Sequence, residues 1–160
     1  MRAIILWATV VLGVLFTSLA AAESFTGRVV KVMDGDTVEV LVERTPVKVR
    51  LQGIDSPESH QAFGQKAKQY ALELMAGKDV RVEVQGQDRY GRTLGEVFLS
   101  DGHSANQMLV GAGYAWWYRK YSQDRRLGTL EAEARAARRG LWVDPSPVPP
   151  WEWRKAKAAR

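Results

Sequence analysis

Two short acidic segments hold the residues best suited to chemistry. Asp34-Gly35-Asp36-Thr37 places two carboxylates within three residues, and one predicted hairpin later Asp55 and Glu58 flank the stiff Ser56-Pro57 pair. Calcium binds about six to eight oxygens from carboxylates, carbonyls and water, and it accepts irregular geometry. The first segment is therefore a candidate cation site, although an isolated Asp-Gly-Asp is more often a hairpin turn with solvated aspartates.

Arginines accompany the acidic segments. Arg50 ends a predicted strand just before Asp55, and Asp88-Arg89-Tyr90-Gly91-Arg92 forms a tight corner with two guanidinium groups and an aromatic ring. Arginine binds phosphate through paired hydrogen bonds, and tyrosine can stack on a base. Two simpler interpretations stay open: an ion pair between Arg50 and Asp55 with Glu58 as a helix cap, and an ordinary basic turn at the corner.

The elements that would position these residues follow from hydrophobic spacing. Valine-rich alternating stretches predict strands, and the Asp34-Gly35 pair and the Glu43 to Pro46 stretch are typical reversals between them. Apolar residues at three-and-four spacing predict helices, with Gly77 and Gly140 as stops and Ser104 as a cap. The predicted strands are 25–33, 38–42, 47–51, 80–84 and 94–99, and the predicted helices are 61–76, 104–110 and 125–139.

This order of elements predicts an α+β fold, a five-stranded OB-type β-barrel with about three α-helices. Residues 23–143 would form the single domain, because the 138 residues after position 22 suffice for one core but not comfortably for two. The segment 144–160 is rich in proline and tryptophan. It is predicted to be an irregular tail that Trp151 and Trp153 pack onto the domain.

The first 22 residues are typical of a secretory signal peptide. Arg2 gives a basic start, Ile4 to Leu19 form an almost unbroken apolar run, and three alanines precede Glu23 as a small-residue cleavage site. We therefore expect an exported protein, periplasmic or secreted, without stable membrane association after cleavage. The alternative is a retained transmembrane anchor, because the apolar run approaches the roughly 20 residues that a spanning helix needs.

Composition narrows the chemistry further. The chain has no cysteine, which excludes disulfides, thiol nucleophiles and cysteine-based zinc sites. Its formal net charge is +5, and it stays at +4 when Arg2 is removed with the signal peptide. A basic protein approaches polyanions such as nucleic acids at lower electrostatic cost, although many exported proteins are mildly basic without binding them.

Together the motifs resemble those of the staphylococcal nuclease family, also called thermonucleases. The resemblance covers residues 25–142 and implies an OB barrel with a calcium site at its rim. The implied ligands are the carboxylates of Asp36 and Asp55 and the main-chain carbonyl of Ser56, with Asp34 supporting them from outside the ligand set. The motifs that carry the resemblance are Asp34-Gly35-Asp36-Thr37, Arg50 with Ile54-Asp55-Ser56-Pro57-Glu58, Asp88-Arg89-Tyr90-Gly91-Arg92, and Glu131-Ala132-Glu133-Ala134 to Gly140-Leu141-Trp142.

The same resemblance implies the roles of the remaining site residues. Glu58 would activate the attacking water, while Arg50 and Arg92 would hold and neutralise the phosphate. Cleavage would leave a 3′-phosphate and a 5′-hydroxyl on DNA, RNA or both. The predicted substrate contacts are Arg89, Tyr90 and Tyr118.

Two other functions remain possible on the sequence. An OB barrel can bind single-stranded nucleic acid without cutting it, and a periplasmic structural protein can use calcium only for stability. The presence of both carboxylates, the glutamate and both arginines favours the enzyme, because neither alternative needs the complete set. The protein is expected to be a monomer.

Overall fold

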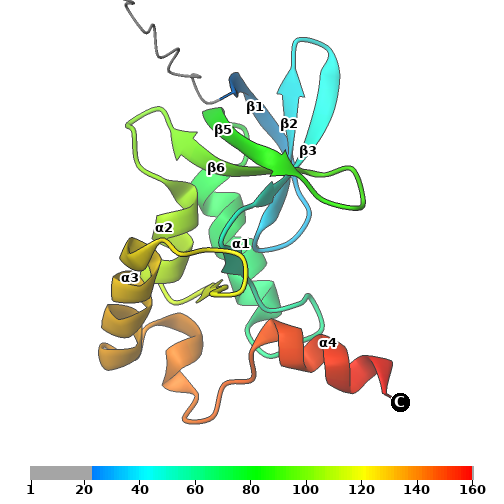
Figure 1. Cartoon of the computed structure of the whole chain (residues 1–160). Coiled ribbons are helices and arrows are strands. Elements are labelled where there is room, and N and C mark those ends of the chain that lie inside the picture. The colour runs from blue at the N-terminus through cyan, green and yellow to red at the C-terminus, as the bar shows by residue number, and fades with distance from the viewer. Residues whose placement is uncertain (1–22, 160) are drawn as a thin grey trace, which may run out of the picture.

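The computed structural model describes residues 23–159, so the predicted signal peptide lies outside the described residues. A β-barrel packs on a group of helices, as Figure 1 shows. Across residues 23–159, every helix is too short or too polar to span a bilayer. The strands are β1 (Ser24–Val32), β2 (Thr37–Val42), β3 (Thr45–Leu51), β4 (Ile54–Asp55), β5 (Asp79–Gln87), β6 (Thr93–Leu99) and β7 (Trp116–Trp117). The helices are α1 (Gly64–Met75), α2 (Ala105–Gly111), α3 (Arg125–Ala136), the 3-10 helix η1 (Gly140–Val143) and α4 (Pro150–Ala158).

Five strands close into a barrel in the order β1-β2-β3-β6-β5, and β1 pairs with β5 to complete the circle. Neighbouring strands are antiparallel except β3 and β6, which run parallel over residues 49–51. The short strands β4 and β7 pair with each other outside the barrel. The predicted three-strand meander and the predicted α+β fold with a five-stranded barrel are confirmed.

Valine alternation along the strands fills the barrel interior and sets its register. Val38 on β2 pairs with Val49 on β3, and neither side chain is exposed to solvent. The same register places Thr37 opposite Arg50. Because successive side chains of a strand point to opposite faces, burying Val49 turns the Arg50 side chain away from the core. The hydrophobic core therefore positions part of the candidate site.

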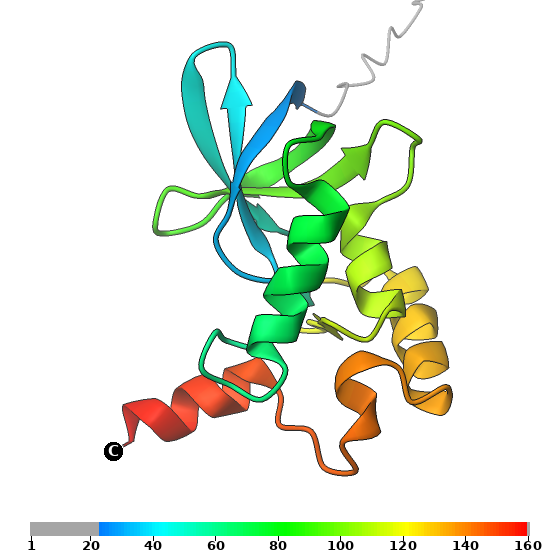
Figure 2. The same ribbon diagram turned by 180° about the vertical axis from the view of Figure 1, so that it is seen from behind.

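The helices cover one end of the barrel. Figure 2 shows α1 reaching from the region of α4 up to the barrel, with α2 beside it and α3 beside α2. Ala67, Ala71 and Met75 are buried on α1, as the predicted spacing of apolar residues requires. The Ser104 side chain caps α2 by accepting a hydrogen bond from the Gln107 main-chain N–H at 3.3 Å.

The tail differs from its prediction. The sequence predicts an irregular segment after residue 143, but Pro150–Ala158 forms helix α4. Pro150 lies at the start of this helix, where a proline loses no hydrogen bond and its fixed φ suits the first turn. The density of prolines is thus a helix-start signal. Trp151 does pack onto the domain, with its ring 5.6 Å from that of Trp116.

Asn106 joins helix α2 to the parallel seam of the barrel. Its buried side-chain amide donates to the main-chain oxygens of Gln52 and Gly95 at 2.9 and 3.3 Å, and its oxygen accepts from Val97 N–H at 3.1 Å. These three main-chain groups lie beside the three-residue pairing of β3 with β6. The Asn106 side chain therefore supplies hydrogen bonds to main-chain groups where β3 and β6 pair over only three residues.

Replacing Asn106 with alanine should lower the free energy of unfolding by about 3 kcal/mol, because a buried polar group left without a partner costs about 1–3 kcal/mol. Urea denaturation followed by circular dichroism measures the loss. Gln107→Ala, one position along α2, is the matched control, with an expected loss below about 1 kcal/mol. Equal losses at the two positions would contradict the bridging role of Asn106.

Candidate active site

Two predicted ligand segments meet at one end of the barrel. Asp36 lies between β1 and β2, whereas Asp55 and Ser56 lie at β4 and the residue after it, and all three are buried. The Ser56 main-chain N–H donates to Asp36 Oδ2 at 2.6 Å. Asp34 Oδ1 accepts a hydrogen bond from the Asp36 main-chain N–H at 3.0 Å, so it supports the turn. The structure thus brings together the residues predicted to bind a cation.

Gly35 permits this close approach. A Cβ atom at position 35 would lie 2.7 Å from both the Cβ and the Oγ of Ser56, and 3.1 Å from the Cβ of Ala67. The sequence suggests that this glycine serves the turn, but its φ lies outside the left-handed region that favours glycine. Its role is instead to leave room for the neighbouring loop.

Arg50 bridges the two buried aspartates. Its Nε lies 3.1 Å from Asp36 Oδ1, and one of its terminal nitrogens lies 2.9 Å from Asp55 Oδ1. Its other terminal nitrogen donates to the main-chain oxygens of Leu51 and Ile54 at 2.6 and 2.9 Å. The ion pair with Asp55 that was open on the sequence is therefore present, and a second pair to Asp36 joins it. Arg50 holds the cluster together before any substrate binds.

Burial raises the pKa of Asp36 to about 8, because the lost hydration of the carboxylate outweighs the attraction of Arg50. The nearby carboxylates of Asp34 and Asp55 raise this pKa further. Arg50 alone therefore does not offset the burial of the Asp36 carboxylate. A second positive charge next to Asp36 would lower the free-energy cost of keeping its carboxylate ionised while buried.

The donor atoms fit a hard cation. They are carboxylate, carbonyl and hydroxyl oxygens, and the buried Ser56 Oγ has no hydrogen-bond partner among the described residues. Across residues 23–159, no three His, Cys, Asp or Glu side chains gather in a metal-binding arrangement. A cation here would therefore rest on Asp36, Asp55 and the Ser56 carbonyl, with water completing its shell, as calcium accepts.

Glu58 lies at the exposed edge of this cluster, with 42% of its side chain open to solvent. It does not cap α1, whose N-cap residue is Phe63. Gln61 fixes its backbone, since the Glu58 N–H donates to Gln61 Oε1 at 3.1 Å and the Glu58 carbonyl accepts from the Gln61 N–H at 2.8 Å. The rigid backbone and open carboxylate suit a group that must reach a solvent molecule.

Arg154 is the site residue that sequence reasoning missed. Its two terminal nitrogens bind Asp55 at 2.8 and 3.2 Å, and one of them binds Glu58 Oε1 at 2.7 Å. Burial opposes the charged form of this side chain, but the hydrogen bonds to Asp55 and Glu58 outweigh it and raise the pKa of Arg154. The sequence signal was a helix start at Pro150, which places Trp151 and Arg154 one turn apart on α4.

The basic turn between β5 and β6 lies at the same end of β6 as the seam with β3. In the parallel pairing of β3 with β6, Val49 lies opposite Thr93 and Arg50 lies opposite Leu94. Arg92 is therefore two residues before the partner of Arg50. The Arg92 guanidinium is held by Asp88 at 2.6 Å. Burial works against the Asp88 carboxylate, but hydrogen bonds from Arg92 and Tyr90 outweigh it and lower the pKa of Asp88. Among residues 23–159, no hydrogen bond or ion pair joins the Arg92 side chain to the aspartate cluster.

Arg89 and Tyr90 are at the exposed tip of this turn. Tyr90 has 69% of its surface open to solvent, and the Arg89 guanidinium lies 4.9 Å from the centre of its ring. Their exposure leaves them available to a substrate, and the structure brings neither into the aspartate cluster.

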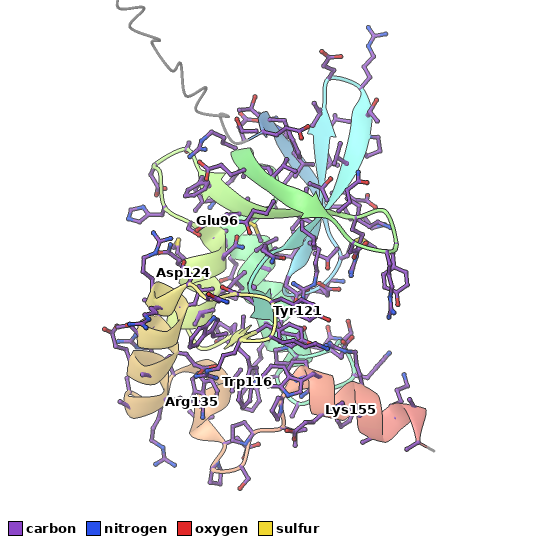
Figure 3. The ribbon with its side chains drawn as sticks, viewed as in Figure 1. Glu96, Trp116, Tyr121, Asp124, Arg135 and Lys155 are labelled. Carbon is purple, nitrogen blue, oxygen red and sulfur yellow. The ribbon has the colours of Figure 1, made fainter. Side chains whose placement is uncertain are left out.

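Tyr118 lies beside the aspartate cluster because β7 pairs with β4. Its main-chain N–H donates to the Gly53 carbonyl at 2.9 Å, and Asp55 pairs with Trp116. The buried Glu131 of α3 anchors the same segment by accepting from the Trp117 N–H at 3.1 Å. Figure 3 shows Trp116 in the space between α3, η1 and the start of α4. The predicted substrate-contact residue Tyr118 is therefore held next to the candidate site.

Comparison with known proteins identifies the family. Residues 48–144 match the family described as "Staphylococcal nuclease homologue". The chain belongs to the staphylococcal nuclease family. The matched part of this nuclease homologue includes Arg50, Asp55, Glu58 and Arg92, whereas Asp36 precedes it and Arg154 follows it.

Relatives of this staphylococcal nuclease homologue cover most of its length. An "Uncharacterized endonuclease" of Escherichia coli O157:H7 is 50% identical over 131 residues, which are 82% of this chain and 86% of the relative. A "Micrococcal nuclease" of Shigella flexneri is 43% identical over 153 residues, covering 89% of this chain and 88% of the relative. An "Uncharacterized endonuclease" of Haemophilus influenzae is 42% identical over 144 residues, or 88% and 80% of the two chains.

Replacing Gly35 with alanine should push Ser56 away from Asp36 and lower the free energy of unfolding by about 1–3 kcal/mol, the usual cost of overpacking. Chemical denaturation measures this change. Gly111→Ala is the matched control, because its added Cβ would meet Leu130 at an ordinary 3.4 Å and would favour α2. The close-approach role of Gly35 fails if the two variants are equally stable.

Proposed function

We propose that the protein is a calcium-dependent nuclease that hydrolyses phosphodiester bonds of DNA and/or RNA and leaves 3′-phosphate ends. The observation that carries this proposal is the pair of buried aspartates, bridged by Arg50, with the half-exposed Glu58 carboxylate linked to Asp55 through Arg154. The family match and the relatives named as endonucleases or a micrococcal nuclease support hydrolysis of nucleic acid.

Phosphodiester hydrolysis demands positive charge around the scissile phosphate. Negative charge grows on its non-bridging oxygens in the transition state, and preorganised cations stabilise that charge. Arg50 and Arg92 would supply guanidinium groups, which bind phosphate oxygens in pairs. Every nitrogen of Arg50 is bonded within the cluster, so its role requires some of these partners to be exchanged for phosphate. Asp36, Asp55 and the Ser56 carbonyl would hold calcium, which when bound supplies a further positive charge at the same phosphate.

Glu58 is proposed as the general base. Its carboxylate would take a proton from a water molecule as the water oxygen forms a bond to phosphorus. The bond from phosphorus to the 5′ oxygen breaks, and this oxygen leaves as a hydroxyl after gaining a proton. The phosphate stays on the 3′ side. In the structure Glu58 is paired with Arg154, so this role requires the pair to open.

Substrate contacts and location complete the proposal. Tyr118, Arg89 and Tyr90 would contact nucleotides next to the scissile bond, through aromatic stacking and charge. Export to the periplasm or the medium rests on the apolar segment before residue 23. We propose a monomer with no stable membrane association after signal cleavage.

Glu58→Gln should lower the rate of hydrolysis at least about 100-fold, because general-base catalysis contributes about 10²- to 10⁴-fold. Arg92→Ala should lower it by about 10²- to 10³-fold, as loss of one transition-state donor does. Hydrolysis of single-stranded DNA, duplex DNA and RNA is measured with calcium and with chelator. Mass spectrometry of the products identifies the phosphorylated end.

Arg28→Ala is the matched control, since it removes an exposed arginine that pairs with Asp79 on the barrel. Its activity should stay within about twofold of wild type. If wild type binds single strands but cuts none of the substrates, the protein is a binding module rather than an enzyme. Activity that persists in chelator would refute the cation, and products with 5′-phosphate would refute the proposed bond cleavage.

A further inference from the structure

Helix α4 places the positive charge of Arg154 and the aromatic ring of Trp151 at the candidate active site of the protein. We propose that Arg154 holds the Asp55 carboxylate, one of the predicted calcium ligands, and competes with calcium for it, so that cation binding releases α4 from the site. This inference rests on the proposed function, because it concerns the same carboxylates. It adds a competing group that neither the sequence motifs nor the family match contains.

The contacts of Arg154 use the lone pairs that a cation would need. Arg154 binds both oxygens of Asp55 and one oxygen of Glu58, while Arg50 binds Asp55 Oδ1 as well. Asp55 is almost fully buried, so its carboxylate can exchange few of these partners for water. A calcium ion bound about 2.3–2.6 Å from an Asp55 oxygen would lie against the Arg154 guanidinium. Like charges in such close contact repel each other strongly even at the effective dielectric constant of a protein surface.

A second contact of α4 covers the predicted nucleotide-contact residue. The Trp151 ring stacks on Tyr118 with 5.1 Å between centroids and 8° between planes. This parallel arrangement is the one that a nucleic-acid base would adopt on the same tyrosine face. Trp151 and Arg154 are one helical turn apart, so a single movement of α4 would free both the tyrosine and the aspartate.

The remaining attachment of α4 is slight enough to be released. Pro150 is its one buried residue, Trp151 and Trp153 are half-buried, and the other residues of the helix are exposed. A cavity of about 70 Å³ lies under this contact, lined in part by Pro57, Trp116 and Trp153. Lys155 lies on the exposed part of α4 in Figure 3. Segments with so few buried contacts open at low free-energy cost.

Isothermal titration with calcium chloride tests the competition directly on the purified protein. Arg154→Ala should bind calcium at least about tenfold more tightly than wild type, because the competing charge is gone. Arg154→Lys keeps the positive charge but cannot bind both carboxylates with a planar guanidinium. Its calcium affinity should lie between those of wild type and Arg154→Ala. Hydrogen exchange of residues 150–158 followed by mass spectrometry should become faster when calcium is added to wild type.

Lys155→Ala is the matched control, because it removes the same charge from the next residue of α4. Its calcium affinity should stay within about twofold of wild type. Wild-type binding of calcium with no gain in Arg154→Ala would overturn the competition while leaving the proposed metal site intact, as would slower exchange of α4 with calcium. Absence of calcium binding in every variant would instead refute the metal site, and the competition with it.

Discussion

The burial of two aspartates around one arginine is the constraint on which the site depends. Asp36 and Asp55 belong to segments on either side of the β2–β3 hairpin, and Arg50 holds both carboxylates from the strand between them. Isolated buried carboxylates are costly, so this arrangement is stable only with compensating positive charge. The buried valines and the register of β2 with β3 place the Arg50 side chain on the strand face that is turned away from the core, next to the two aspartates. The strand register that stabilises the barrel therefore also positions the charged residues at its rim.

The same constraint explains why so many different elements converge here. Arg50 compensates part of the buried charge, while burial raises the pKa of Asp36 above its ordinary value. Arg154 of α4 adds a positive charge at Asp55 and Glu58, but in the described part of the chain it forms no ion pair with Asp36. A cation bound by both aspartates would add positive charge at Asp36 as well. Arg154 and such a cation share the Asp55 carboxylate, which links the tail of the protein to the rim of its barrel.

Much of the fold and part of the site can be predicted from the sequence, because they depend on local patterns. Alternating valines identify the five barrel strands, and glycine and serine identify helix ends, since each acts on its immediate neighbours. Asp36 and Asp55 are associated by the resemblance of their motifs to one family, and the hairpin between them brings the two segments together. Gly35 is recognisable as special, but its reason is not, because Ser56 approaches it from another loop.

Arg154 could not be placed in this way. It contacts Asp55 across 99 positions of sequence, and no periodic pattern spans that distance. Helix α4 was not predicted either, because a proline-rich segment can either start a helix or break one, and composition alone does not distinguish the two cases. Asn106 is a similar case, since only the finished barrel shows the unpaired main-chain groups that it satisfies.

The position of Arg154 in the sequence has a consequence for the order in which the protein is made. Synthesis proceeds from the N-terminus, and domains begin to fold as their residues emerge. All five barrel strands and the Asp36, Arg50 and Asp55 cluster precede residue 100, so the cluster can assemble before α4 has been translated. During that interval the nascent site has one guanidinium fewer than the finished protein. Asp55 and Glu58 gain their Arg154 partner only when α4 docks, so α4 is the element that completes the site.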